Sequence, residues 1–365
     1  MSRAHRELPR PRVVIANVTN PVPDMLDFDA LWADHELPPP PAHRHTLFEQ
    51  PVGWGFHIYA LGVHMLDRGL ARQVEFWDYA RRRSTEYHGN GVLKVRFFNE
   101  ADVAAYLRRY GPPDLFVNYG RTGRPLLELV AGQCFRVHVP CTRAADERDG
   151  NSGAECYLID DEAYLDDRSM LYVPVVNTRR ICPGDDPKVR DFIYLASVYE
   201  GKRHDLLLRT VEGTGLTGHL HPVEPGQLDV RNPNITTSAF GERSVVELLR
   251  SSRIAVYPSD RTSNAAAMWE CVAAGLPIVV NAAIRGGKHL VVPGVTGELA
   301  AEDELLATMR RVLARRASYA PRRHFEEAWD TLATLERYLA FFGQMGLRLP
   351  ACSRSADRHT AGRRC

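Results

Sequence analysis

Lysine is scarce in this sequence of 365 residues, although Lys and Arg together number 46. Lysine occurs only at Lys94, Lys188, Lys202 and Lys288, so arginine carries nearly all the positive charge. Asp and Glu number 45, which leaves a formal net charge of +1. A chain this close to neutral lacks the excess of positive charge with which proteins bind nucleic acid, so we expect no nucleic-acid partner.

Long apolar runs and paired cysteines are also lacking. No apolar run approaches 18 residues, which excludes a membrane-spanning helix, although peripheral contact with a membrane stays open. The N-terminal stretch has no signal-peptide core. The seven cysteines are odd in number and form no C-x-x-C pair, which is typical of free thiols in a reducing compartment. We therefore expect a cytoplasmic protein.

Several catalytic motifs do not occur. The absence of G-x-S-x-G and of a Walker A loop argues against a serine hydrolase and a nucleoside triphosphatase. The D-x-D at residues 27–29 does not follow a predicted strand and is expected by chance among 45 acidic residues. His43-x-His45 and His219-x-His221 have no third ligand at a suitable spacing, so we expect no metal site.

Residues 253–280 predict a strand, a polar loop, a helix and a second strand. The first strand ends at Pro258-Ser259, and Ser263 or Asn264 is a suitable N-cap for the helix. The N-terminus of a helix just past the carboxyl end of a parallel strand binds anions, because its free N–H groups and its dipole point outward. This unit therefore predicts an anion site.

Glu270 lies about two turns inside that predicted helix. Its neighbours in the sequence are apolar, namely Ala266, Ala267, Met268, Trp269, Cys271 and Val272. A carboxylate in such surroundings is expected to face a cleft, where it could accept hydrogen bonds from the hydroxyl groups of a ligand. The alternative is an ordinary glutamate on a solvent-exposed face of the helix.

These residues carry a resemblance to the donor site of retaining GT-B glycosyltransferases of the family-4 group. The signature of that family reads P-S, then E-x7-E, then A-x-G-x-P-V-V. The matching positions are Pro258-Ser259, Glu270, residues 274–277 and residues 279–280, followed by Gly286-Gly287 and the turn at 294–297. The resemblance implies that Glu270 binds the ribose hydroxyls of a nucleotide.

The resemblance extends upstream and covers about 110 residues. Residues 192–207 resemble the first strand and helix of the family's nucleotide domain, and Lys202 matches a lysine that holds the diphosphate. Two positions depart from the pattern. Thr262 replaces the first Glu of E-x7-E, and Ala196-Ser197 replaces a Gly-Arg pair that also contacts the phosphates. We expect Ser197, Ser263 and Thr262 to add neutral donors to this site. The N–H groups at the start of the helix near Asn264 are expected to neutralise the diphosphate together with Lys202.

The first half of the chain predicts alternating strands and helices. Strands are expected at 13–18, 72–79, 92–98, 113–118, 134–139 and 172–177, and helices at 57–69, 101–110 and 125–132. Gly53 and Gly55 loosely match a glycine-rich loop of the family, although ordinary turn chemistry explains them as well. His138 ends the strand at 134–139. It matches an active-site histidine of the family, but a hydrogen-bonded core histidine is an equal alternative.

The resemblance implies the GT-B fold, in which two Rossmann-like α/β/α domains face each other across a cleft. We expect an acceptor domain over residues 1–184 and a nucleotide-sugar domain over 185–322. A single helix over 323–345, with an apolar stripe from Phe325 to Phe342, is expected to cross back onto the first domain. Residues 346–365 are rich in Arg and Ser and are expected to be a disordered tail.

The expected function is transfer of a sugar from a nucleotide diphosphate to a small-molecule or glycan acceptor, with retention and without a metal or other cofactor. Lys202 and His138 are the catalytic candidates. Gly55, Ser197, Thr262, Ser263, Asn264 and Glu270 are the donor-binding candidates. Two alternatives stay open, a nucleotide-sugar 2-epimerase of the same fold and a non-catalytic homologue that binds a nucleotide sugar or a partner protein. The sequence does not indicate the oligomeric state.

Overall fold

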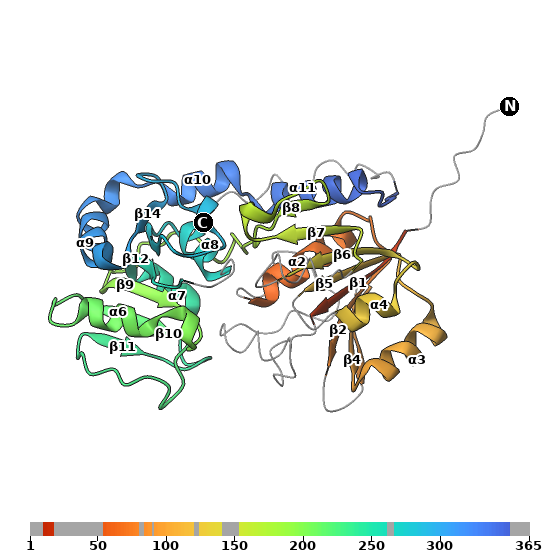
Figure 1. Cartoon of the computed structure of the whole chain (residues 1–365), viewed down its shortest axis with the longest axis horizontal. Helices are drawn as coiled ribbons and strands as arrows, with labels where there is room; N and C mark the ends of the chain where they lie inside the picture. Colours follow the sequence, from red (N-terminus) through yellow and green to blue (C-terminus); the bar gives the residue numbers. More distant parts are fainter. Residues whose placement is uncertain are drawn as a thin grey trace.

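The computed structural model of the chain describes residues 10–17, 54–79, 84–89, 91–119, 124–140, 153–260 and 266–350. Within these ranges the chain forms two β-sheets, each flanked by helices, which make the right and left lobes in Figure 1. Every described strand pairing is parallel except one, that of β3 with β4. The expected pair of parallel-sheet α/β domains is therefore confirmed.

The first sheet has the strand order β3-β4-β2-β1-β5-β6-β7-β8. Its strands are β1 (Arg12–Asn17), β2 (Gln73–Tyr79), β3 (Ser84–Gly89), β4 (Val92–Phe97), β5 (Leu115–Tyr119), β6 (Phe135–Val139), β7 (Cys156–Ile159) and β8 (Ser169–Leu171). The helices of this lobe are α2 (Trp54–Asp67), α3 (Glu100–Tyr110) and α4 (Arg124–Leu129), with the short η3 (Glu162–Tyr164). The strand order reverses between β1 and β5, where a ligand crevice is expected in an open sheet of this kind.

Side chains on both faces of β1 are buried. Val13 and Ile15 belong to the core cluster on the face covered by α2, while Val14 and Ala16 belong to the cluster on the face covered by α3 and α4. This alternation is the two-residue period of a strand, and burial on both faces explains why β1 reads as a continuous apolar run.

The second sheet has the order β11-β10-β9-β12-β13-β14. Its strands are β9 (Arg190–Leu195), β10 (Gly218–His221), β11 (Ile235–Thr237), β12 (Ser252–Tyr257), β13 (Ile278–Asn281) and β14 (Gly297–Ala300). The helices are α6 (His204–Val211), α7 (Val245–Arg250), α8 (Ala266–Ala273) and α9 (Leu305–Arg315), with the short η4 (Glu200–Lys202), η5 (Lys288–Leu290), η6 (Glu302–Glu304) and η7 (Arg316–Ser318). Here the order reverses between β9 and β12, so the segments after these two strands flank the expected ligand crevice.

The segment from 172 to 177 differs from the prediction, because it forms no strand. β7 and β8, which the sequence did not indicate, complete the first sheet in its place. The reason lies in the partners of its backbone groups. Val173 N–H and C=O both bond to the hydroxyl of Tyr338, at 2.6 and 2.7 Å, and those of Val176 bond to the hydroxyl of Thr331. Side chains of a later helix thus take the place of a neighbouring strand.

The single helix expected over 323–345 is instead two helices, α10 (Pro321–Ala328) and α11 (Thr331–Gln344). Asp330 causes the break, because its backbone is not helical and its side chain caps α11 by accepting from the N–H groups of Leu332 and Ala333. Phe325 of α10 packs in the core of the second lobe, whereas Phe342 of α11 packs in the core of the first. The crossing from one lobe to the other is visible in Figure 1.

The chain after α11 is described as far as residue 350. Leu347 is buried against the core of the first lobe, so at least this part of the expected tail is packed. Residues 351–365 lie outside the described residues. Among the described helices, none has the length and apolar character that a bilayer crossing requires.

Replacing Tyr338 by Phe tests the contact between α11 and the segment from 172 to 177. The change leaves the buried N–H and C=O of Val173 without the hydroxyl partner, so we expect a loss of about 1–3 kcal/mol in the free energy of unfolding. Urea or thermal unfolding measures this loss. The control is Tyr110→Phe, since Tyr110 is 55% exposed and should be close to neutral. Equal stability of the two variants would contradict the contact.

Candidate functional site

Tyr194 holds the ends of β9 and β12 together at the reversal of the second sheet. It is fully buried in β9, and burial raises the pKa of its hydroxyl. The hydroxyl donates to the carbonyl oxygen of Lys202 at 2.6 Å and bonds to Ser259 Oγ at 3.0 Å. The turn that carries Lys202 is therefore fixed against the residues that follow β12.

Lys202 ends the short helix η4 after β9. Its side chain is half-buried, and its Nζ lies 5.3 Å from the centre of the Tyr199 ring. Burial lowers the pKa of this ammonium group to about 8. No carboxylate of the described residues forms an ion pair with it, whereas Arg203 beside it forms three. Lys202 thus carries a partly desolvated positive charge in the turn after β9.

Ser197 and Ala196 follow β9 where the resembling family has Gly-Arg. Ser197 is exposed, and Ala196 is buried with its N–H donating to the carbonyl oxygen of His221 at 2.8 Å. Ser197 supplies at most a neutral hydroxyl, so Lys202 and Arg203 are the cations of this turn, and Arg203 is bound to carboxylates.

Glu270 is buried in α8, with only 6% of its surface exposed. Its neighbours Trp269 and Cys271 are fully buried, so the alternative of an exposed helix face does not hold. The N-cap candidates Ser263 and Asn264, together with Thr262, lie outside the described residues. The role of Glu270 toward a ribose and the start of the helix that carries it therefore stay predictions.

His138 lies near the carboxyl end of β6 in the first sheet and is 4% exposed. Its neighbour across the strand pairing is Asn118 of β5, whose Nδ2 donates to His138 Nδ1 at 3.1 Å. Burial lowers the pKa of His138 to about 4, so the imidazole is neutral near pH 7. Asn118 was not indicated by the sequence. Its polar side chain at the end of an apolar strand was the available signal.

Gly55 lies in the first turn of α2, because the helix begins at Trp54 rather than at 57. The glycine-rich loop expected there is therefore partly helical, and Gly53 lies outside the described residues. The contribution of Gly55 to a donor site stays a prediction.

The two lobes also meet at the Gly286-Gly287 pair. Gly287 has a positive φ of 82°, and its N–H donates to the carbonyl oxygen of Asp160 after β7 at 3.4 Å. His289 Nδ1 lies 4.0 Å from Glu162 Oε1 beside the same junction. A left-handed backbone suits glycine, so Gly287 adopts this conformation without strain at the contact between the lobes.

His219 and His221 bond to hydroxyl groups in the interior of the second lobe. His219 Nδ1 lies 2.7 Å from Thr236 Oγ1, and Ser238 Oγ lies between His219 Nε2 and His221 Nδ1 at 2.8 and 2.9 Å. Across the described ranges, no group of three or more possible ligands is arranged to hold a metal ion. His43 and His45, and the D-x-D at 27–29, lie outside those ranges.

The spacing G-x-G-x-x-G occurs once, at residues 213–218. These glycines follow α6 and lead into β10. A dinucleotide-binding turn has the opposite order, because it follows a strand and opens a helix. The match therefore gives no support for a dinucleotide site.

Solved structures with a similar fold include sucrose-phosphate synthase from Thermosynechococcus elongatus, with 14% identity, 92% of this chain and 99% of that chain covered, and a TM-score of 0.67. HepE from Anabaena, solved in complex with UDP-glucose, is 10% identical in sequence and has a TM-score of 0.64. The match covers 92% of this chain and 100% of the HepE chain. AviGT4, a glycosyltransferase involved in avilamycin A biosynthesis, is 15% identical in sequence and has a TM-score of 0.55. The match covers 93% of this chain and 99% of the AviGT4 chain.

No protein-family model matches the sequence, and no curated protein matches it. At such low identities the likeness establishes the fold alone. It confirms the GT-B fold that the sequence motifs implied.

Acidification tests the buried histidines. Burial lowers the pKa of His138, His204 and His289 to about 4 and that of His219 to about 3. The unfolded chain binds protons at these residues below about pH 6.5, whereas the folded chain binds them only near pH 4. We therefore expect the stability to fall as the pH is lowered from about 6.5 to about 4, by up to about 1.4 kcal/mol per pH unit for each histidine.

Thermal unfolding at pH 7, 6, 5 and 4.5 measures this loss. Two replacements, His138→Asn and His219→Asn, should each make the decline shallower. A melting temperature that does not change between pH 6.5 and 4.5 would contradict the burial of neutral histidines.

Proposed function

We propose that the protein is a GT-B glycosyltransferase that moves a sugar from a nucleotide-diphosphate donor to a small-molecule or glycan acceptor. The observation that carries this proposal is the position of Lys202. Its half-buried ammonium group has no carboxylate partner among the described residues and lies at the reversal between β9 and β12. A positive charge at that place suits a diphosphate, because ligands of such sheets bind beyond the carboxyl ends of these strands.

In the proposed reaction, the bond between the anomeric carbon of the sugar and the diphosphate oxygen breaks, and a bond from an acceptor oxygen to that carbon forms. Negative charge develops on the leaving diphosphate, where Lys202 stabilises it. The acceptor proton passes to the leaving phosphate. Retention of the anomeric configuration and independence from metals are proposed on the resemblance to family-4 enzymes.

The other candidates serve binding in this proposal. Glu270 accepts hydrogen bonds from the ribose, and its burial in α8 supports a contact shielded from water. Ser197, Thr262, Ser263, Asn264 and Gly55 contact the donor through neutral groups. His138 contributes a ring nitrogen near the donor sugar, and its contact with Asn118 orients the ring. The cleft between the two lobes excludes water and orients the acceptor.

A UDP-sugar is the first donor to test, because HepE has been solved with UDP-glucose and shares this fold. We propose a cytoplasmic role in natural-product or cell-envelope biosynthesis, on the basis of the composition and of the involvement of AviGT4 in avilamycin A biosynthesis.

A non-catalytic homologue is the second candidate, and the replacement of Gly-Arg by Ala196-Ser197 favours it. A panel of nucleotide sugars, screened for thermal stabilisation and then for release of free nucleoside diphosphate, separates the candidates. A transferase hydrolyses its donor slowly or transfers it to an acceptor. A binding protein is stabilised without turnover, and a 2-epimerase converts the sugar without needing an acceptor.

Lys202→Ala should lower kcat/KM by at least about tenfold, since one charge-assisted contact contributes about 1.5–3 kcal/mol. Lys202→Arg keeps the charge and is the matched control. In the wild type, binding of a nucleoside diphosphate should weaken above about pH 8, where free Lys202 loses its proton, and this dependence should vanish in the Arg variant. Equal affinity in wild type and the Ala variant would show that the diphosphate binds elsewhere, with exposed Arg285 as the next residue to test.

Glu270→Gln should raise the donor KM more than it lowers kcat. A ribose contact is the same in the ground state and in the transition state, so its loss weakens binding without changing the chemical step. Glu128→Gln, at an exposed position of α4, is the control. A large fall in kcat with an unchanged KM and an unchanged melting temperature would instead indicate a catalytic carboxylate.

A further inference from the structure

Tyr199 lies directly before the short helix η4, which ends at Lys202. The N–H of Lys202 donates to the carbonyl oxygen of Tyr199 at 2.9 Å, which closes a turn with the three-residue spacing of a 3-10 helix. Side chains three residues apart lie one above the other in such a turn. The local backbone therefore brings the Tyr199 ring and the Lys202 side chain together.

The contact between these two side chains has the geometry of a cation–π interaction. The Lys202 Nζ lies over the Tyr199 ring, 5.3 Å from its centre. The face of an aromatic ring attracts a cation within about 6 Å, and it does so more strongly where the cation is desolvated. Burial lowers the pKa of Lys202 to about 8, so water solvates this ammonium group less well than that of a surface lysine. The ring replaces part of the lost solvation.

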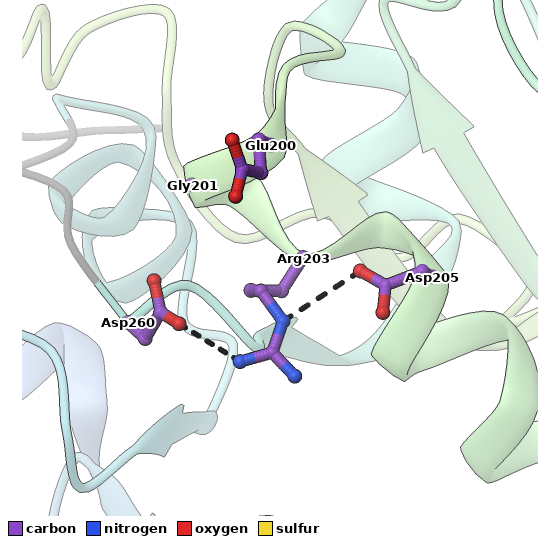
Figure 2. A pocket seen from close by; sticks show the side chains of 5 residues that line it. All are labelled: Glu200, Gly201, Arg203, Asp205 and Asp260. Carbon is purple, nitrogen blue, oxygen red and sulfur yellow. Dashed lines mark hydrogen bonds and ion pairs between the residues drawn. The ribbon is translucent and has the colours of Figure 1, made fainter.

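The carboxylates around this turn bind a different cation, Arg203. Figure 2 shows its guanidinium between Asp260 and Asp205, with Nη1 at 2.8 Å from Asp260 Oδ2 and Nε at 3.6 Å from Asp205 Oδ1. Glu302 after β14 is the third carboxylate that Arg203 binds. The cavity beside the guanidinium has a volume of about 280 Å³ and is lined by Glu200, Gly201, Arg203, Asp205 and Asp260. Lys202 is not among these residues, so its ammonium group belongs to a separate contact.

The titratable residues beside Lys202 do not replace the contact with the ring. Within the described ranges the ammonium group forms no hydrogen bond and no ion pair, and it lies over Tyr199. His204, the first residue of α6, is neutral near pH 7, because burial lowers its pKa to about 4. The Tyr194 hydroxyl bonds to the backbone carbonyl of Lys202 rather than to its side chain. Two different tyrosines thus hold the backbone and the side chain of Lys202.

We propose that Tyr199 is a positioning residue, whose ring holds and stabilises the Lys202 ammonium group in the turn after β9. It acts on a diphosphate through Lys202 and contacts no reacting atom itself. For its ligand this inference rests on the proposed function. The contact between the ring and the ammonium group belongs to the free protein and is testable without any ligand.

The first experiment measures the pKa of Lys202 without ligand, by competitive acetylation and peptide mass spectrometry with exposed Lys288 as the internal reference. Tyr199→Leu keeps an apolar side chain beside the ammonium group but removes the ring face. Because a ring face favours the charged form, its loss should lower the pKa of Lys202 from about 8 by about 0.4–1.5 pH units. Tyr199→Phe keeps the ring and should leave this pKa unchanged. Tyr199→Met takes the place of the leucine variant if that variant does not fold.

The second experiment measures the Kd of UDP and of inorganic pyrophosphate at pH 7.5 by calorimetry. Tyr199→Leu should raise both Kd values by the same factor, about threefold to tenfold, whereas Tyr199→Phe should stay within about twofold of wild type. In a Lys202→Ala chain, Tyr199→Leu should have no further effect, because the ring acts through the ammonium group. The matched control is Tyr110→Leu, at an exposed tyrosine of α3 that has Arg109 over its ring. It should change neither Kd.

The proposal is overturned if Tyr199→Leu leaves the pKa of Lys202 unchanged, or if it weakens UDP binding equally with and without Lys202. A loss confined to UDP, with pyrophosphate binding intact, also overturns it and indicates that Tyr199 contacts the nucleoside directly. A wild-type protein that binds none of UDP, GDP, ADP and pyrophosphate would contradict the proposed function instead. In that case the labelling experiment still decides whether the Tyr199 ring stabilises the Lys202 ammonium group.

Discussion

The buried hydroxyl of Tyr194 is the contact on which the candidate site depends. A phenol in the interior needs hydrogen-bond partners, and this one finds them in the backbone of Lys202 and in the side chain of Ser259. The two partners come from the segments after β9 and β12, the pair of strands between which the sheet order reverses. One buried group thus fixes the geometry of the place where a ligand is expected in a parallel sheet of this kind.

The arrangement of the two lobes depends on a second set of buried contacts. The hydroxyls of Tyr338 and Thr331, both on α11, bond to the backbone of the segment that leads from the first sheet to the second. Asp330 lies between α10 and α11 and caps the start of α11. The two helices therefore pack separately, α10 on the second lobe and α11 on the first. The chain therefore crosses between the lobes twice, and the two crossings bond to each other.

Charge is balanced locally as well as over the whole chain. The net charge is near zero, yet the turn after β9 gathers four carboxylates and two cations. Arg203 binds three carboxylates, whereas Lys202 forms an ion pair with no carboxylate of the described residues, and the two are adjacent in the sequence. Guanidinium groups suit such shared contacts because their donors form a planar fork, whereas an ammonium group is a compact point charge. The division of roles between these neighbours follows from that difference.

The sequence determined the alternation of strands and helices, because buried strands such as β1 and β12 are continuous apolar runs with turn residues at their ends. The motifs around Pro258, Glu270 and Gly286 then implied the GT-B fold. The tertiary structure decided three things that local patterns do not contain. The apolar segment after Tyr172 forms no strand, because side chains of α11 bond to its backbone groups. The apolar stripe from Phe325 to Phe342 is divided between the cores of the two lobes. The contacts of Asn118 with His138, and of Arg203 with Asp260 and Glu302, join residues 20 to 99 positions apart, which only the folded sheet edges bring together.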